Sequence, residues 1–439
     1  MPSSIIPQDD KCNGWYQLLP EPLGASRLNT PITADCLVIG GGFTGLAAAR
    51  RFAEIRPDKR VVLLEALRLG QGASGRNTGF VIDLPHKRDL EGDDLVRKQT
   101  LLSLNRAAIA DLQTLIHHHG INCGWSVAGK YQGAVGDRGL KYLEQFETLL
   151  KNVDYPFKRL ERSELAPIIG TEHYAAAIYT ANTALMQPAA LVRGLGNSLP
   201  TNVELYEESP VVKLSYAGGY WSAVTPEGQV RATHLLLGSN IYAQQFGFLK
   251  HRMLPVMTFA SMTRALSDAE MALFSAKPHH FGLTPADHAG TTVRLTPDRR
   301  LVIRNQYRFV PHYHDDLSER TRIRDVHRHS FDARYPSLSH VPFTATWGGA
   351  CGLSRNYTAF FGKVGENAWM SGVHQSVGAA RGTISGKLLA EMAAGQDSSQ
   401  LADMLAVSGK PGRNPPEPFL SLGVKARMKQ ASWASRHEL

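Results

Sequence analysis

The chain has 439 residues, 43% of them hydrophobic and 20% charged, so it is too long for one ordinary core and two interleaved domains are expected. It contains no uncharged apolar run of about 18 residues, and its polar start lacks the basic-then-apolar order of a signal peptide, which predicts a cytoplasmic protein. The net charge of +9 is not gathered in a block with interleaved aromatics, which argues against nucleic-acid binding. The remaining explanations of this charge are solubility and the attraction of an anionic ligand.

The first predicted elements after an irregular arm form a nucleotide-binding unit. In chain order they are a strand at 36–39, the glycines Gly40, Gly42 and Gly45 of a G-x-G-x-x-G turn, a helix at 46–54 and a second strand at 61–64. A strand, a tight turn and a helix in this order direct backbone N–H groups and the positive end of the helix at a pyrophosphate.

Glu65 ends the second strand, 20 residues after Gly45. A carboxylate at this point can accept hydrogen bonds from ribose hydroxyls, whereas it would repel a 2′-phosphate. The ligand predicted from these residues is therefore FAD or NAD rather than NADP.

A loop of small residues at 69–80 distinguishes between FAD and NAD as the predicted ligand. It reads L-G-Q-G-A-S-G-R-N-T-G-F, and its glycines let the backbone lie against a flat ring system and a phosphate chain. Here the sequence resembles the D-amino-acid-oxidase-like flavoprotein superfamily, especially its glycine oxidase, sarcosine oxidase and γ-glutamylputrescine oxidase branch, whose members carry a similar G-x-G-A-S-G-R-N-G-G segment. The resemblance implies FAD.

The resemblance continues in the family's order to residue 391. The matching segments are M-Q-P-A-A-L-V-R at 186–193, a strand pair at 203–213, A-T-H-L-L-L-G-S-N at 232–240, R-L-T-P-D-R-R-L-V-I-R at 294–304, W-G-G-A-C-G at 347–352, and a final strand and helix at 367–391. The backbone near Val212 is thereby implied to meet the adenine side, and Gly238 stands where the family usually has alanine.

The implied fold class is α/β, with a discontinuous Rossmann-like FAD-binding domain and a second α+β substrate domain built on a mixed β-sheet. The chain divides into an N-terminal arm at 1–33, FAD-binding segments at 34–85, 185–245 and 345–410, substrate-domain segments at 86–184 and 246–344, and a C-terminal linker with a basic helix at 411–439. Trp15 and Tyr16 are the expected packing anchors of the arm. Within the substrate domain the patterns predict a helix at 95–119 that ends at Gly120, and strands at 291–295 and 301–305.

The expected cofactor-binding residues come from the turns and from the resemblance. They are Gly40, Gly42, Phe43, Thr44, Gly45, Glu65, Ala66, Gly72, Ala73, Ser74, Arg76, Asn77, Thr78, Val212, Gly238, Gly349, Cys351, Ser376, Val377 and Gly378. The last three align with a family loop that usually reads G-x-S-G-H-G, so its histidine is missing here. Cys351 resembles the cysteine that is linked covalently to FAD in sarcosine oxidases; we expect non-covalent FAD, with a covalent link as the alternative.

The substrate contacts of sarcosine oxidases are not retained. Gly79 and Ala380 stand where those enzymes have an arginine and a lysine that hold the substrate carboxylate, so a simple N-methylglycine clamp is absent. Arg76, Arg304 and Arg381 remain candidates for an anionic group, and each is equally a candidate for a surface or phosphate-facing residue. The substrate-pocket candidates are Asp83, His86, Arg304, Tyr307, His374 and Arg381, and no catalytic residue is assigned.

The scattered cysteines and the three consecutive histidines at 117–119 have no metal-ligand spacing, so no metal is expected. The leading prediction is an FAD-dependent oxidase of a small primary or secondary amine or amino acid, with O₂ reduced to hydrogen peroxide. The alternatives are a dehydrogenase that passes electrons to a quinone or carrier, and a nucleotide-binding protein without turnover. The basic tail at 424–437 is expected to pack on the protein rather than on a membrane.

Overall fold

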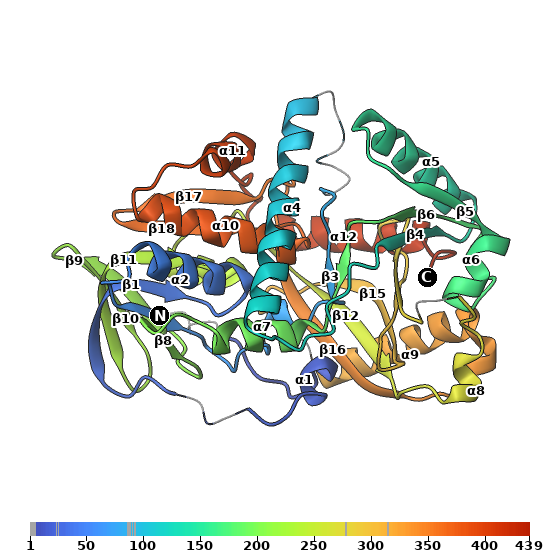
Figure 1. Cartoon of the computed structure of the whole chain (residues 1–439), viewed down its shortest axis with the longest axis horizontal. Coiled ribbons are helices and arrows are strands. Elements are labelled where there is room, and N and C mark those ends of the chain that lie inside the picture. Colours follow the sequence, from blue (N-terminus) through green and yellow to red (C-terminus); the bar gives the residue numbers. More distant parts are fainter. Residues whose placement is uncertain are drawn as a thin grey trace.

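The computed structural model describes residues 6–22, 24, 26–85, 89, 91, 94–276, 279–313 and 316–439. Within these residues the chain forms two eight-stranded sheets and one two-stranded pair. Figure 1 shows the first sheet in the left half of the molecule and the second in the right half. This architecture confirms the predicted α/β class with a Rossmann-like part and a second sheet-based part.

The first sheet has the strand order β17-β18-β11-β1-β2-β8, and β10 and β9 continue from β11. Its strands are β1 (Pro31–Ile39), β2 (Val61–Leu64), β8 (Val203–Tyr206), β9 (Lys213–Ala217), β10 (Tyr220–Val224), β11 (Gln229–Leu237), β17 (Phe360–Gly365) and β18 (Ala368–Gly372). The pairs of β1 with β2 and β11, of β2 with β8, and of β11 with β18 are parallel. Because helices cover such a sheet, its central strands are apolar on both faces, and every residue of β2 is buried.

Helices α2 (Phe43–Ile55) and α10 (Gly378–Ala393) pack tightly together on this sheet. A Cβ on Gly386 of α10 would lie only 2.1 Å from the carbonyl oxygen of Thr44, so glycine permits the close approach. The helices α4 (Leu95–His118), α7 (Pro188–Asn197) and α11 (Ser399–Val407) complete this layer. The helix predicted at 95–119 is confirmed to within one residue, and Gly120 follows it with φ +61°.

The second sheet has the order β16-β12-β15-β14-β13-β4-β6-β5 and is mixed, because β13 and β4 run parallel. Its strands are β4 (Lys130–Ala134), β5 (Lys158–Glu161), β6 (Ala176–Thr180), β12 (Leu254–Thr263), β13 (Phe281–Pro285), β14 (Thr292–Leu295), β15 (Leu301–Phe309) and β16 (Phe343–Leu353). The helices of this part are α5 (Asp137–Asn152), α6 (Arg162–Ile169), α8 (Asp268–Met271), α9 (Leu317–Arg334) and α12 (Phe419–Ala434). Strands β14 and β15 confirm the two predicted around the turn at 296–300.

Strand β16 joins the second sheet rather than the first. It pairs with β12 from Phe343 to Leu353, although residues 345–353 fall inside a segment that the sequence assigned to the FAD-binding domain. The sequence pattern W-G-G-A-C-G identifies a strand next to the cofactor, but it does not say which sheet supplies its hydrogen-bond partners. The pairing places β16 at the edge of the second sheet, between the two parts.

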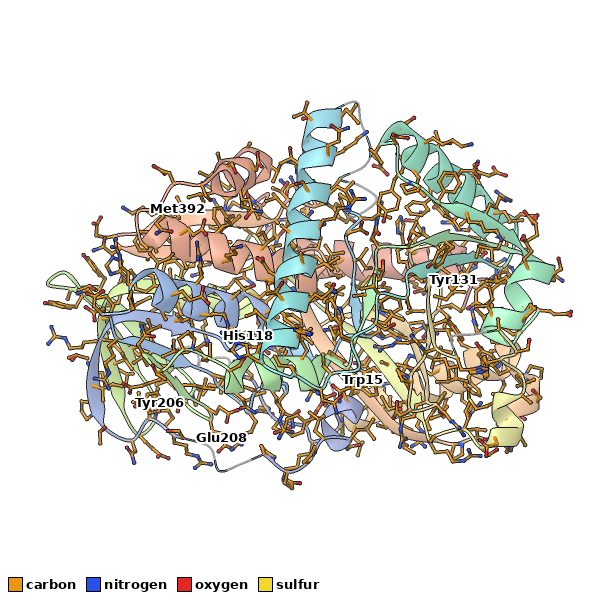
Figure 2. The ribbon with its side chains drawn as sticks, viewed as in Figure 1. Trp15, His118, Tyr131, Tyr206, Glu208 and Met392 are labelled. Carbon is orange, nitrogen blue, oxygen red and sulfur yellow. The ribbon has the colours of Figure 1, made fainter. Side chains whose placement is uncertain are left out.

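Trp15 of α1 (Gly14–Gln17) lies where the two parts meet (Figure 2). Its ring packs edge-on against Trp347 with centroids 6.1 Å apart, and its indole N–H donates to the carbonyl of Asn77 at 2.8 Å. The two-stranded pair β3 (Phe80–Val81) and β7 (Ala184–Leu185) and the short helices η1 (Ala73–Gly75), η2 (Asn240–Phe246) and η3 (Pro336–Leu338) are the remaining elements. In the part of the chain that the structure describes, no helix has both the length and the apolarity needed to cross a bilayer.

Candidate cofactor and active site

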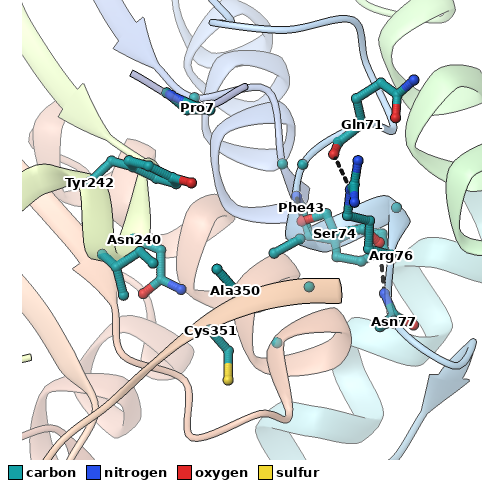
Figure 3. A pocket seen from close by; sticks show the side chains of 18 of the residues that line it. Pro7, Phe43, Gln71, Ser74, Arg76, Asn77, Asn240, Tyr242, Ala350 and Cys351 are labelled. Carbon is teal, nitrogen blue, oxygen red and sulfur yellow. Dashed lines mark hydrogen bonds between the residues drawn. The ribbon is translucent and has the colours of Figure 1, made fainter. Parts of the chain in front are cut away.

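A cavity of about 480 Å³ lies at the carboxyl ends of β1 and β2 and extends to β12 and β15 of the second sheet. Its walls include the turn after β1, the loop after β2, strand β16 and the loop before α10 (Figure 3). The predicted cofactor residues that line it are Gly40, Gly42, Phe43, Thr44, Glu65, Ala66, Gly72, Ala73, Ser74, Arg76, Asn77, Thr78, Gly238, Gly349, Cys351, Ser376, Val377 and Gly378. The carboxyl ends of parallel strands are where open α/β sheets bind ligands.

The turn between β1 and α2 depends on its glycines. Gly40 has φ +105°, which residues with a side chain rarely adopt. A Cβ on Gly45 would lie 1.8 Å from the Gly40 carbonyl oxygen, so glycine at this position allows α2 to pack closely against the end of β1. Gly45 does not line the cavity. Gly42 caps α2 without a side-chain hydrogen bond of its own, and the Phe43 N–H donates to Ser74 Oγ, which leaves the other first-turn N–H groups for an anion.

The Glu65 carboxylate holds the turn after β1 by hydrogen bonds to backbone N–H groups. One carboxylate oxygen accepts from the Gly41 N–H at 2.6 Å and the other from the Leu67 N–H at 2.9 Å. Burial raises the pKa of this carboxyl, and the two N–H donors oppose that rise. The carboxylate is thus fixed at the cavity wall, where a ribose would lie beside the phosphate turn.

We expect Glu65→Gln to weaken FAD binding about tenfold, because a charge-assisted hydrogen bond contributes about 1.5 kcal/mol or more. Glu65→Lys is expected to weaken it further. The measurement is flavin absorbance per polypeptide after dialysis, followed by a fluorescence titration of the stripped protein. Glu208→Gln is the control, since Glu208 pairs with Arg27 on the surface. Equal retention by Glu65→Gln and the control would refute a ribose-binding role.

The small-residue loop is held by its own polar side chains. Ser74 Oγ accepts from the Phe43 N–H at 3.2 Å, and the Asn77 amide donates to the Ser74 carbonyl at 2.6 Å. Arg76 Nε donates to the Gln71 carbonyl at 2.6 Å (Figure 3). These bonds tie the loop to the first turn, so the two glycine-rich segments form one continuous wall.

The N-terminal arm reaches the cavity, which the sequence analysis missed. Residues 6–10 line the cavity, and Asp10 makes a two-bond ion pair with Arg76 at 2.6 and 3.0 Å. Arg320 of α9 also approaches Asp10, at 3.3 Å. Arg76 is therefore engaged by protein rather than free for an anionic substrate, and nothing in the polar sequence before Cys12 signals this contact.

The loop between β18 and α10 has a strained backbone. Val373, Gln375 and Ser376 have φ values of +59°, +52° and +66°, a region that is costly for residues with a side chain and most costly for a β-branched one. The Gln375 amide supports the loop by donating to Ser354 Oγ at 2.9 Å and to the Val373 carbonyl at 3.1 Å. Strain of this kind is characteristic of positions that a binding site requires.

Helix α10 begins directly after this loop and points its N-terminus at the cavity. Val377 caps it without a side-chain hydrogen bond, and Gly378, Ala379 and Ala380 line the cavity. The positive end of a helix stabilises negative charge, as a reduced flavin ring carries at its pyrimidine end.

His374 connects this loop to the phosphate turn. Its Nε2 lies 3.2 Å from Thr44 Oγ1, and its buried Nδ1 has no partner among the described residues. Burial, with a smaller effect of Arg381, lowers the pKa of His374 to about 3. The ring is thus neutral, and its Nε2 contact ties the loop before α10 to the first turn of α2.

His374 should make the protein sensitive to acid. Because its pKa is about 6.5 in the unfolded chain and about 3 when folded, its contribution to stability is present above pH 6.5 and is lost as the pH falls toward 3. We expect His374→Asn to lose less stability between pH 7 and pH 5 than the unmodified protein does. Urea unfolding at both pH values measures this, with the exposed His329→Asn as the control. Identical losses in all three proteins would contradict the assignment.

Arg304 and Tyr307 stand together at the second-sheet end of the cavity. Residues three apart on a regular strand face opposite sides, but β15 has a bulge at Gln306, where φ is +62° and the register with β12 shifts. The extra residue brings the Arg304 guanidinium over the Tyr307 ring, 4.8 Å from its centroid. Arg304 lines the cavity, whereas Tyr307 does not, and the Tyr307 hydroxyl donates to the His288 carbonyl at 3.3 Å.

Arg304 has no carboxylate partner among the described residues. By contrast, Arg308 on the same strand pairs with Glu319 at 2.8 Å. An unpaired guanidinium in the wall of a cavity is suited to an anionic ligand group.

The remaining substrate candidates lie away from the cavity wall. Asp83 is buried and accepts from the Tyr155 hydroxyl at 2.8 Å, and Arg381 pairs with Asp89 at 2.9 Å. Both charges are therefore satisfied within the protein. Val212, which the sequence analysis named as a cofactor-binding residue, donates its N–H to the Val224 carbonyl and does not line the cavity; residues 209–211 line it. His86 lies outside the described residues.

Gly79 has no side chain because a buried arginine occupies the space beside it. A Cβ there would lie 1.7 Å from an Arg294 nitrogen, and that guanidinium donates to the carbonyls of Thr78 and Met186 at 2.9 and 2.6 Å. Burial lowers the pKa of Arg294 to about 10. The sequence motif that begins at Arg294 thus supplies a structural cation that supports the cofactor loop from the second sheet.

These features fit FAD. The helix N-terminus at Gly42 suits the pyrophosphate, Glu65 suits a ribose, and the small residues of the second loop leave room for a ring system. The N-terminus of α10 suits the part of the ring system that gains negative charge on reduction.

Comparisons with known proteins agree with this geometry. The family model described as FAD dependent oxidoreductase (DAO) matches residues 35–392. The chain is 27% identical over 379 residues to a probable oxidoreductase OrdL of Haemophilus influenzae, covering 83% of this chain and 84% of that protein. It is 26% identical over 412 residues to the γ-glutamylputrescine oxidoreductase of Escherichia coli, covering 90% and 92%.

Among solved structures, glycine oxidase from Geobacillus kaustophilus shares the fold, with a TM-score of 0.73 and 18% identity, and the match covers 88% of this chain and 100% of that one. The family model spans well over half of the sequence and includes both glycine-rich segments and all but the last residue of α10. The chain therefore belongs to the DAO family of FAD-dependent oxidoreductases.

Proposed function

We propose that this flavoprotein oxidises a small primary or secondary amine or amino acid that carries an anionic group, with O₂ as the electron acceptor. The observation that carries the proposal is Arg304, a guanidinium without a carboxylate partner among the described residues in the wall of a cavity that fits FAD. A relative of similar length is a γ-glutamylputrescine oxidoreductase, which supports an amine substrate for this chain as well.

Arg304 serves the reaction in two ways. Its charge binds an anionic group of the substrate, and the same positive charge disfavours the ammonium form of the substrate amine nearby. A neutral amine is the form that gives up a hydride, so the chain needs to orient the C–H bond and exclude water rather than supply a strong base. FAD bound in the cavity would supply a hydride acceptor, which would leave an imine for hydrolysis by water and a reduced cofactor for reoxidation by O₂ to hydrogen peroxide.

Other cavity residues position the substrate and support the reduced cofactor. Thr258, Thr284 and Thr292 line the side of the cavity formed by the second sheet. At the opposite side the N-terminus of α10 faces the cavity and stabilises added negative charge. The described carboxylates that line the cavity are Asp9, Asp10 and Glu65. Asp10 and Glu65 are held by the contacts described above, and Asp9 accepts from the Lys11 N–H at 2.9 Å and from the Gln71 amide at 3.4 Å, so each of them is engaged by the protein.

A panel of amines and amino acids tests the proposal, with hydrogen peroxide measured in one arm and reduction of an artificial acceptor in the other. Peroxide formation, together with rapid reoxidation by O₂ in stopped flow, supports an oxidase. Turnover only with the artificial acceptor would replace O₂ with a quinone or carrier. A yellow protein without turnover of any amine would overturn the amine assignment.

We further propose that FAD is bound without a covalent link. Cys351 lines the cavity with Sγ 3.5 Å from Ser376 Oγ, and burial raises the pKa of this thiol, which disfavours the nucleophilic thiolate. Precipitation in acid is expected to release the yellow colour into the supernatant. Colour that stays with the polypeptide, and is released in Cys351→Ala, would show a covalent bond.

A further inference from the structure

Helix α12 is held to the protein along only one stripe. Leu420, Val424 and Met428, spaced four residues apart, are half-buried, and no residue of the helix is fully buried. Figure 1 shows α12 on the side of the molecule that carries the second sheet, and its main packing contact is with β15. The tail therefore packs on the protein through one face of α12, as the sequence predicted, and the opposite face of the helix is exposed.

Both ends of the helix segment are firmly anchored. Before it, buried Asn414 donates its N–H to the His251 carbonyl at 2.7 Å and its amide to Met253 at 3.2 Å. After it, the buried Glu438 carboxylate accepts from the N–H groups of Val135 and Gly136 at the start of α5, at 3.0 and 2.9 Å. The orientation of α12, and therefore of its outer face, is fixed by these anchors.

The outer face of α12 is apolar. Phe419, Leu422 and Trp433 are the large apolar side chains of this helix that are exposed, at 68%, 64% and 67%. At about 100° per residue these three side chains and Ala426 lie within roughly 60° of one another, directly opposite the half-buried stripe. Large apolar side chains gathered on one exposed ridge mark an interaction surface.

Cations border this ridge on both sides. On the same helical projection Lys425 and Lys429 fall on one side and Arg427 on the other. Arg436 follows the end of the helix, and its guanidinium lies over the Trp433 ring, 4.6 Å from the ring centroid. Residues 419–436 contain no aspartate or glutamate, and no described carboxylate pairs with Lys425, Arg427 or Lys429. An apolar ridge flanked by lysine and arginine is the pattern of a helix that lies in the interface of an anionic membrane.

We propose that the outer face of α12 docks on an anionic lipid surface. Phe419, Leu422 and Trp433 enter the boundary between headgroups and acyl chains, and the flanking cations contact the headgroups. A second copy of the chain is a poorer occupant, because a twofold contact through this ridge would bring like charges together. The proposal concerns a surface remote from the cavity and does not depend on the substrate.

Flotation of the full-length holoprotein with lipid vesicles tests this surface. The protein should bind vesicles of phosphatidylcholine mixed with phosphatidylglycerol, and bind pure phosphatidylcholine at least tenfold more weakly. The variant Phe419→Ser/Leu422→Ser/Trp433→Ser should lose at least tenfold in binding. The matched control Val96→Ser/Leu317→Ser/Leu405→Ser removes exposed apolar side chains from other helices and should bind normally.

A charge-reversal pair separates a specific effect from net charge. Lys425→Glu/Lys429→Glu should lose at least tenfold in vesicle binding, whereas Lys141→Glu/Lys363→Glu changes the net charge equally on exposed positions elsewhere and should lose less than threefold. No binding to anionic vesicles, or equal losses in both pairs, would overturn the proposal. A dimer in sedimentation that dissociates in the triple-serine variant would assign the ridge to a second copy instead.

Discussion

Gly45→Ala is expected to yield protein that retains less than a tenth of the flavin of the unmodified chain. The added Cβ would lie 1.8 Å from the Gly40 carbonyl oxygen, which is backbone and cannot move aside without opening the turn. Displacing α2 from β1 removes the N–H groups that the pyrophosphate requires. Flavin absorbance per polypeptide measures the loss, and circular dichroism reports whether the remaining fold is intact.

Two further glycine variants define how local this effect is. Gly386→Ala disturbs the same turn from α10, because its Cβ would lie 2.1 Å from the Thr44 carbonyl oxygen. Gly423→Ala on α12 has open space around its Cβ and is the control for the substitution itself. Full flavin retention in Gly45→Ala would mean that the strand–helix contact is not what shapes the phosphate site.

Arg304→Met is expected to lower kcat/KM for an anionic amine about 10- to 100-fold, mainly by raising KM. This magnitude corresponds to one or two charge-assisted hydrogen bonds, at about 1.5–3 kcal/mol in total. An amine of similar size without an anionic group should lose less than threefold. The measurement is steady-state turnover of both substrates by the two proteins, at equal flavin content.

Arg308→Met is the matched control for this effect. Arg308 lies on the same strand, but its guanidinium pairs with Glu319, so its loss should leave the ratio of the two substrates unchanged. If Arg304→Met lowered turnover of both substrates equally, Arg304 would be a structural cation, and the anionic substrate class would have to be abandoned.

The family and the cofactor could be predicted from the sequence because they depend on local order along the chain. Gly40 and Gly42 follow an apolar strand, Gly45 lies in the first turn of the next helix, which begins at Phe43 rather than at the predicted residue 46, and Glu65 directly follows the second strand. These short-range patterns point to one nucleotide site. The helix at 95–118 and the strands of the second sheet were also recognisable, since each has its own periodicity.

The contacts that bring distant segments together could not be predicted in the same way. The pairing of Asp10 with Arg76, of His374 with Thr44, and the placement of β16 in the second sheet each join residues that are far apart in the sequence. Asp83 and Arg381 illustrate the converse, because charged residues near motifs were plausible substrate contacts until their protein partners were known.

By itself, the amino-acid sequence determined the nucleotide-binding turn, the acid that follows it and the family to which the chain belongs, because these are written in consecutive residues and their spacing. Only the tertiary structure decided which arginine at the cavity wall has no carboxylate partner among the described residues. That outcome depends on the bulge at Gln306, which turns Arg304 and Tyr307 to one side, and on the carboxylates that pair with Arg76, Arg308 and Arg381. Charge pairing is a property of positions in space, and no periodicity along the chain encodes it.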